Sequence, residues 1–137
     1  MNISINLQES VDYAEKINIY NDGEVTVYSA DDDGFKKIAQ GWKSLVCDAH
    51  EMPAYGVSLN EGTLKALNSG LWAEFVFNKC YEHNGMPFEK LLISVAKEYY
   101  GFNIIRYTSQ RGYDGRCFYY DLVGRNMDDF YDIILKN

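Results

Sequence analysis

The sequence predicts an α+β fold, with an antiparallel or mixed sheet of about five to six strands and three main helices packed largely on one face. Stretches in which apolar and polar residues alternate, separated by short turns, indicate strands joined as hairpins. Other stretches repeat apolar residues every three or four positions, which is typical of helices. The chain has 137 residues, the usual size of one domain, so we expect residues 1–137 to fold as a single unit.

The clearest strand signal is a hairpin near the N-terminus. Residues 17–20 and 24–29 alternate apolar and polar side chains, and the segment from Asn21 to Gly23 favours a tight turn between them. Residues 71–77 are apolar on both faces except for Glu74, which predicts a central strand. Further strands are predicted at residues 3–7, at an edge, and at residues 55–59. Residues 103–108 and 117–122 are predicted to form a second hairpin across a polar, glycine-bearing connection.

Three main helices are predicted from apolar spacing. The first follows an acidic run that suits a helix N-terminus, and its apolar residues are Phe35, Ile38, Trp42, Leu45 and Val46. The second begins at Pro87, because proline is tolerated at the first helical position, and its apolar residues are Phe88, Leu91, Leu92, Val95 and Tyr99. The third follows Asn126, and a shorter helix is predicted over residues 60–68.

The charge of the chain argues against a direct nucleic-acid partner. The net charge is −7, whereas binding to phosphates needs clustered Lys and Arg. The charge is also unevenly spread along the sequence: residues 1–51 contain ten acidic and four basic side chains. All four arginines lie in the neutral C-terminal third, at Arg106, Arg111, Arg116 and Arg125.

The sequence also bears on the compartment. No stretch approaches the roughly 20 apolar residues needed to cross a bilayer, so we expect no membrane insertion. The N-terminal residues lack the basic and apolar segments of a signal peptide, which favours a cytoplasmic protein. The odd number of cysteines (Cys47, Cys80 and Cys117) fits reduced thiols, and each is expected to be buried.

Two Cys-x-x-His pairs are the sharpest motif in the chain. They consist of Cys47 with His50 and of Cys80 with His83. A structural zinc ion takes four such ligands, so convergence of the pairs would make a zinc-stabilised domain. The alternative is coincidence, in which buried thiols stand beside surface histidines and the protein holds no cofactor.

A second hypothesis concerns Glu74. A carboxylate within an apolar strand can be buried and perturbed, and together with Arg106 it could line the pocket of a small ligand-binding protein or enzyme. The alternative is a structural ion pair between Glu74 and an arginine such as Arg106. No motif assigns a catalytic residue, so a protein that is not an enzyme is favoured.

The loop from Arg111 to Arg116 is a candidate recognition surface. Its arginines can contact carboxylates or phosphates, and Tyr113 can add amphipathic contact area. The alternative is a simple hairpin turn whose arginines are solvated.

The acidic run Asp31, Asp32 and Asp33 is the other candidate partner-binding surface. It either caps a helix in solvent or imitates phosphate charge and binds another, basic protein. In its small size, acidity and lack of catalytic motifs, the chain resembles bacterial or phage immunity and inhibitor proteins, which implies a protein-binding, inhibitory module. A homodimer formed through exposed sheet edges is also compatible with the sequence.

Overall fold

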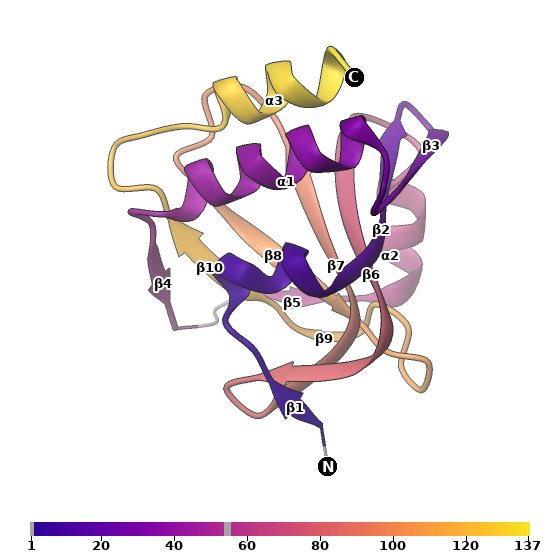
Figure 1. Cartoon of the computed structure of the whole chain (residues 1–137). Helices are drawn as coiled ribbons and strands as arrows, with labels where there is room; N and C mark the ends of the chain where they lie inside the picture. The colour runs from indigo at the N-terminus through magenta and orange to yellow at the C-terminus, as the bar shows by residue number, and fades with distance from the viewer. Residues whose placement is uncertain (1, 54–55) are drawn as a thin grey trace.

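The fold is α+β, as predicted, with a mostly antiparallel sheet. The computed structural model describes residues 2–53 and 56–137. The main sheet runs in the order β3-β2-β6-β7-β8-β10-β4, with β1 added in parallel to β6, and β5 and β9 form a separate pair (Figure 1). The elements are β1 (Ile3–Ser4), η1 (Leu7–Tyr13), β2 (Ala14–Asn21), β3 (Glu24–Ser29), α1 (Asp33–Val46), β4 (His50–Met52), β5 (Val57–Ser58), α2 (Asn60–Ala66), β6 (Leu71–His83), β7 (Met86–Val95), β8 (Gly101–Tyr107), β9 (Gly115–Arg116), β10 (Phe118–Asp121) and α3 (Asp128–Leu135).

Both predicted hairpins are confirmed. Strands β2 and β3 are joined at Asp22 and Gly23, whose φ values of 49° and 89° give the left-handed two-residue turn that suits a hairpin. Strands β8 and β10 pair antiparallel, as residues 103–108 and 117–122 predicted. The predicted strand over residues 55–59 is represented by β5, and Tyr55 lies outside the described residues.

The predicted helix after Pro87 is wrong, because this segment is strand β7. It follows β6 through a two-residue turn at Asn84 and Gly85, both with positive φ, and that turn is a strong hairpin signal. Leu91 packs in the main core while Leu92 packs on the opposite face of the sheet. A strand buried on both faces has a nearly continuous apolar sequence, and short runs of that kind also match helical spacing.

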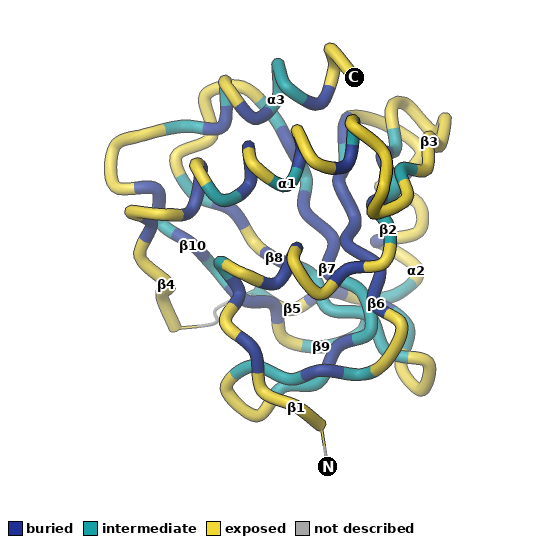
Figure 2. The backbone as a smooth tube through the Cα atoms, viewed as in Figure 1, coloured by how far each residue is buried: buried dark blue, intermediate teal, exposed yellow. Residues whose placement is uncertain are grey.

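The main core lies between one face of the sheet and the layer formed by η1, α1 and α3 (Figure 2). Trp42 of α1 is fully buried at its centre, and its indole N–H donates to the carbonyl oxygen of Leu7 at 3.3 Å. Its ring meets Phe75 of β6, Phe102 of β8 and Phe130 of α3 at centroid distances of 5.1, 5.7 and 6.2 Å. This single side chain therefore joins the sheet to three helical segments.

The opposite face of the sheet is covered by α2 and by the loop between β8 and β9. Leu67, Leu92 and Tyr113 form a small buried cluster there. The helices therefore divide between the faces, with the short α2 opposite α1 and α3. Within residues 2–53 and 56–137, no helix combines the length and apolar character that a membrane crossing requires.

Replacing Trp42 with alanine should destabilise the fold more than most substitutions. A buried Trp→Ala change removes apolar contacts and leaves a cavity, and it typically lowers the free energy of unfolding by about 3–5 kcal/mol. Urea titration followed by far-ultraviolet circular dichroism measures this loss. The same substitution at Trp72, which is only half-buried, is the control and should cost less. Equal losses for the two variants would contradict the central position of Trp42.

Candidate functional site

Five carboxylates flank strand β3, two at the β2–β3 turn and three in the connection from β3 to α1. We call this group the acidic edge; its members are Asp22, Glu24, Asp31, Asp32 and Asp33. All five residues are exposed, and among the described residues none of their carboxylates forms an ion pair. Residues 15–37 contain six acidic and three basic side chains, so this part of the chain has a net charge of −3.

The acidic edge is held in place by backbone contacts. The Asp32 carboxylate accepts the Ser29 N–H at 2.8 Å, and the Asp32 N–H donates to the Ser29 carbonyl oxygen at 2.9 Å. At the hairpin turn, the Asp22 N–H donates to the Gly70 carbonyl oxygen at 2.9 Å, and the Asp22 carboxylate accepts the Gly70 N–H at 2.8 Å. The backbone is thus fixed at both ends of β3, while Asp31 and Asp33 carry carboxylates free for other partners.

The loop between β8 and β9 differs from the predicted recognition surface. Arg111 and Arg116 are exposed, but Tyr113 is only 4% exposed, so the prediction that its ring contacts a partner is wrong. The Arg106 guanidinium donates to the carbonyl oxygens of Pro87 and Arg116, each at 2.8 Å. The Arg106 guanidinium is therefore partly engaged in hydrogen bonds within the protein.

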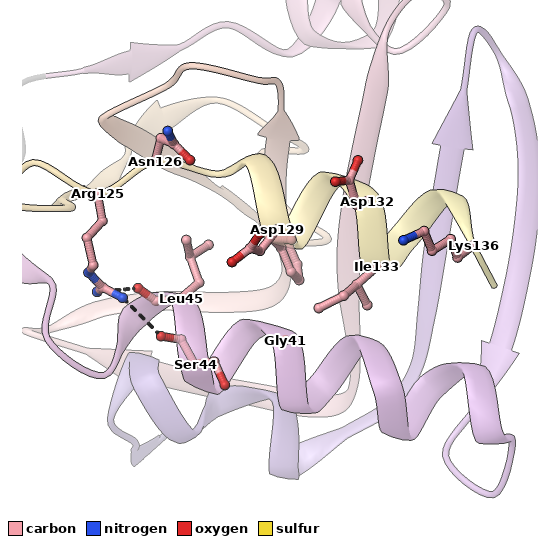
Figure 3. A pocket seen from close by; sticks show the side chains of 10 residues that line it. Gly41, Ser44, Leu45, Arg125, Asn126, Asp129, Asp132, Ile133 and Lys136 are labelled. Atoms are coloured by element: carbon pink, nitrogen blue, oxygen red, sulfur yellow. Dashed lines mark hydrogen bonds between the residues drawn. The ribbon is translucent and has the colours of Figure 1, made fainter.

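The fourth arginine, Arg125, lies elsewhere. Its guanidinium donates to the carbonyl oxygens of Ser44 and Leu45 at 3.3 and 2.8 Å, at the C-terminal end of α1 (Figure 3). A cation at a helix C-terminus complements the helix dipole and satisfies carbonyls that lack partners within the helix. The four arginines consequently do not form one positive patch.

Glu74 is completely buried, and its hydrogen-bond partners are an amide and two hydroxyls rather than an arginine. Its carboxylate accepts from Asn18 at 3.1 Å, from the Tyr20 hydroxyl at 2.9 Å and from the Tyr113 hydroxyl. The strand register places Glu74 on the same face as Leu92 and Ile105, whereas Arg106 faces the other side. The expected pair of Glu74 with Arg106, as ion pair or as pocket lining, is therefore wrong.

These contacts make the Tyr113 loop part of the scaffold. The Tyr113 N–H donates to the Asn60 side chain at 3.0 Å, and the Asn60 N–H donates to the Asp114 carboxylate at 2.6 Å. The loop is thereby fastened both to α2 and to the buried carboxylate. Burial raises the pKa of Tyr113 and of Tyr20, and the nearby Glu74 carboxylate raises the pKa of both hydroxyls further.

The two Cys-x-x-His pairs do not converge. Among the described residues, no three His, Cys, Asp or Glu side chains are placed to hold a metal ion, so the predicted site of Cys47, His50, Cys80 and His83 is not formed. The ring of His83 is engaged on both sides, by the Ile5 carbonyl oxygen at 2.9 Å and by the Glu51 carboxylate at 2.7 Å.

The three thiols differ in burial. Cys117 is buried, as predicted, and burial raises the pKa of its thiol. Cys80 is half-buried, and its thiol pKa is also raised by burial. Cys47 is exposed, so the expectation that all three cysteines are buried is wrong for this residue. It lies just beyond the C-terminal end of α1, where the chain turns toward β4.

The described residues form several grooves at the surface. One groove, of about 680 Å³, lies between α1 and α3, where Arg125, Asp129, Asp132 and Lys136 line it together with apolar side chains (Figure 3). Two adjoining hollows of about 410 and 300 Å³ on the opposite sheet face share Trp72, Asn103 and Ile105. Neither Glu74 nor Arg106 lines any of these three.

Sequence reasoning missed two features of the surface. Val25 and Val27 of β3 are 52% and 53% exposed, although their alternating pattern predicted only a strand. The pair of His83 with Glu51 has no local signal, because 32 positions separate the two residues. Comparison with known proteins adds no assignment: no protein-family model, no curated protein and no solved structure matches this chain.

The Tyr113→Phe variant should test the Glu74 cluster. At neutral pH, loss of the hydroxyl leaves a buried carboxylate short of one donor and should lower the free energy of unfolding by about 1–3 kcal/mol. Above about pH 10 the unfolded chain releases a tyrosine proton that the folded state retains, so stability falls as pH rises. For each such tyrosine the slope averages about 1 kcal/mol per pH unit between about pH 10 and 11 and approaches about 1.4 kcal/mol per pH unit once the unfolded residue is fully ionised.

Between about pH 10 and 11, the free energy of unfolding should therefore fall less steeply with pH in the variant than in the wild type. The difference between the two slopes should equal the contribution of one tyrosine. Urea unfolding at several alkaline pH values measures both slopes. Tyr100→Phe, at a ring that is 56% exposed, controls for the substitution itself. Identical slopes for Tyr113→Phe and wild type would contradict a Tyr113 hydroxyl held protonated by the fold.

Proposed function

We propose that this protein is a binding module for a basic protein partner and that the acidic edge is its contact surface. The observation that carries the proposal is the group of five exposed carboxylates without an ion pair in the described residues. A concentration of one sign of charge raises the rate of encounter with a surface of opposite sign and disfavours other partners.

The placement of these carboxylates supports binding rather than a role in the fold alone. Only Asp22 and Asp32 accept backbone hydrogen bonds, through one carboxylate oxygen each. Asp31 and Asp33 accept no hydrogen bond from any described residue. Asp31, Asp32 and Asp33 are consecutive, so these like charges repel one another, and a partner that supplies cations would relieve that repulsion.

The mode of action that fits this surface is inhibition by occupation. An acidic surface that imitates phosphate charge can fill the basic cleft of a protein that acts on nucleic acid. Arg106 and Arg125 donate to backbone carbonyl oxygens, and the exposed Arg111 and Arg116 are fewer than the five carboxylates of the acidic edge. We therefore place the cations of the complex on the partner.

Neutralising two carboxylates should slow association with the partner. Cross-linking in the cells that make the protein, followed by mass spectrometry, identifies the partner for purification. The Asp31→Asn/Asp33→Asn variant should then bind with an association rate constant about tenfold lower at low ionic strength. The difference should shrink as salt screens the charges beyond about 10 Å. Stopped-flow measurements over a range of salt concentrations give both quantities.

The Asp48→Asn/Asp129→Asn variant is the matched control, since it removes two exposed negative charges remote from β3. Its association rate should remain near that of the wild type. If both variants slow association equally, net charge rather than the acidic edge governs encounter. If neither does, the proposed contact surface is wrong.

A further inference from the structure

Strand β3 is the open edge of the main sheet. It pairs with β2 on one side only, and no described segment covers its other side (Figure 1). Its residues are exposed along the strand apart from Tyr28, which is half-buried (Figure 2). The opposite end of the sheet is β4, which has only three residues, so β3 with its six residues is the longer free edge.

The hydrogen-bonding phase of the hairpin shows which backbone groups are free. The two-residue turn makes Asn21 and Glu24 a hydrogen-bonded pair, and such pairs then recur at every second position. The Ala30 N–H donates to the Glu15 carbonyl oxygen at 3.2 Å, which continues the same phase past the end of β3. The N–H and C=O groups of Val25 and Val27 consequently point away from β2.

These free groups belong to a strand that lacks the usual protection of sheet edges. Proline, inward-pointing charges, lysines on the strand and bulges normally prevent an edge from accepting another strand. Within β3 there is no proline or lysine, and its pairing with β2 runs without a register shift. Instead, the strand presents the half-exposed side chains of Val25 and Val27.

The edge is also rigid before any partner arrives. The contacts of Asp22 with Gly70 fix the turn at one end, and those of Asp32 with Ser29 fix the other. The same contact with Asp32 occupies the outward N–H and C=O of Ser29, which limits the free edge to Val25 and Val27. A preorganised edge loses little conformational entropy when a strand is added.

We propose that the β3 edge binds an extended segment of a basic protein as an additional strand. This inference rests on the proposed function and specifies how the acidic edge engages its partner. Backbone groups of the segment would exchange hydrogen bonds with Val25 and Val27, and its apolar side chains would cover the two valines. The six residues of β3, from Glu24 to Ser29, extend over roughly 17 Å, so an extended segment of similar length flanked by Lys or Arg at both ends fits the charges.

A second copy of this chain fits the same edge poorly. In an antiparallel pair, Val25 of one copy would face Val27 of the other. The turn carboxylate Asp22 of each copy would then approach Asp31 of the other, and like charges side by side destabilise such an arrangement. The cationic segment, in contrast, satisfies the backbone groups and the carboxylates together.

The test uses a synthetic peptide, Lys-Lys-Val-Thr-Val-Thr-Lys-Lys, and the full-length protein. Fluorescence anisotropy should show binding that weakens as salt is added. Amide exchange measured by NMR should slow at Val25 and Val27 by about tenfold or more at saturation, because these two N–H groups gain acceptors. The neighbouring amides of Thr26 and Tyr28 already donate to β2 and should change less.

Three matched comparisons isolate the backbone contacts. A peptide with N-methylated valines keeps the charge but loses its donors, and it should bind about tenfold more weakly or worse. A peptide with Glu in place of Lys should not bind. In the protein, Val27→Pro removes an outward N–H without breaking a β2–β3 hydrogen bond, and it should weaken binding by a similar factor. The N-methylated peptide gives the same information if that variant fails to fold.

The outcomes separate the docking mode from the proposed function. Peptide binding could depend on Asp31 and Asp33, tolerate N-methylation and leave the Val25 and Val27 amides unprotected. That result would overturn strand addition but would leave the acidic contact surface intact. Protection of these amides without peptide, together with a dimer in analytical ultracentrifugation, would assign the edge to a second copy. No binding of the cationic peptide would also overturn the inference, whereas the partner kinetics of Asp31→Asn/Asp33→Asn decide the proposed function independently.

Discussion

The arrangement of this protein depends on one buried carboxylate. A buried carboxyl group needs hydrogen-bond partners, and Glu74 in the central strand β6 finds donors on three other residues. Two of them, Asn18 and Tyr20, lie on the neighbouring strand β2, but the third, Tyr113, lies in the loop between β8 and β9. Its loop must therefore fold over the second face of the sheet, where it also binds the start of α2 through Asn60. The hydrogen bonds of buried Glu74 thus hold the layer on this face of the sheet in place. They also keep Tyr113, in the loop predicted to be a recognition surface, away from solvent.

Local patterns predicted most of the architecture, and the errors arose where distant contacts decide. The turn at Asp22 and Gly23 and the apolar spacing around Trp42 specify their elements through neighbours in sequence, so the first hairpin and α1 were predictable. The segment after Pro87 was not, because β7 is covered on both faces and its apolar residues lack the alternation that marks a strand. The preceding Asn84 and Gly85 are typical of a tight hairpin turn and indicated a strand. The prediction of a helix gave more weight to the spacing of the apolar residues.

The candidate site was predictable in its charge but not in its geometry. Exposed aspartates after β3 follow from composition and from their position before a helix, and the structure confirms that they are solvent-exposed. The arginines show why a segregation of charge along the sequence is not a segregation in space. Arg106 and Arg125 donate to backbone carbonyl oxygens, contacts that no sequence pattern specifies. Likewise, the outward direction of the Val25 and Val27 amides follows only from the hairpin register, which has to be known to one residue.

The open edge of β3, with its exposed Val25 and Val27, affects how readily the isolated protein self-associates in concentrated solution. Strands of this kind are templates on which identical molecules stack into filaments, and electrostatic repulsion is what delays the process. The carboxylates beside β3 therefore oppose self-association of the protein, in addition to attracting a basic partner. Acidification or high ionic strength weakens that repulsion. The purified protein should consequently stay monodisperse best in dilute buffer near neutral pH. Its resistance to aggregation on storage then depends on a few surface charges rather than on the core.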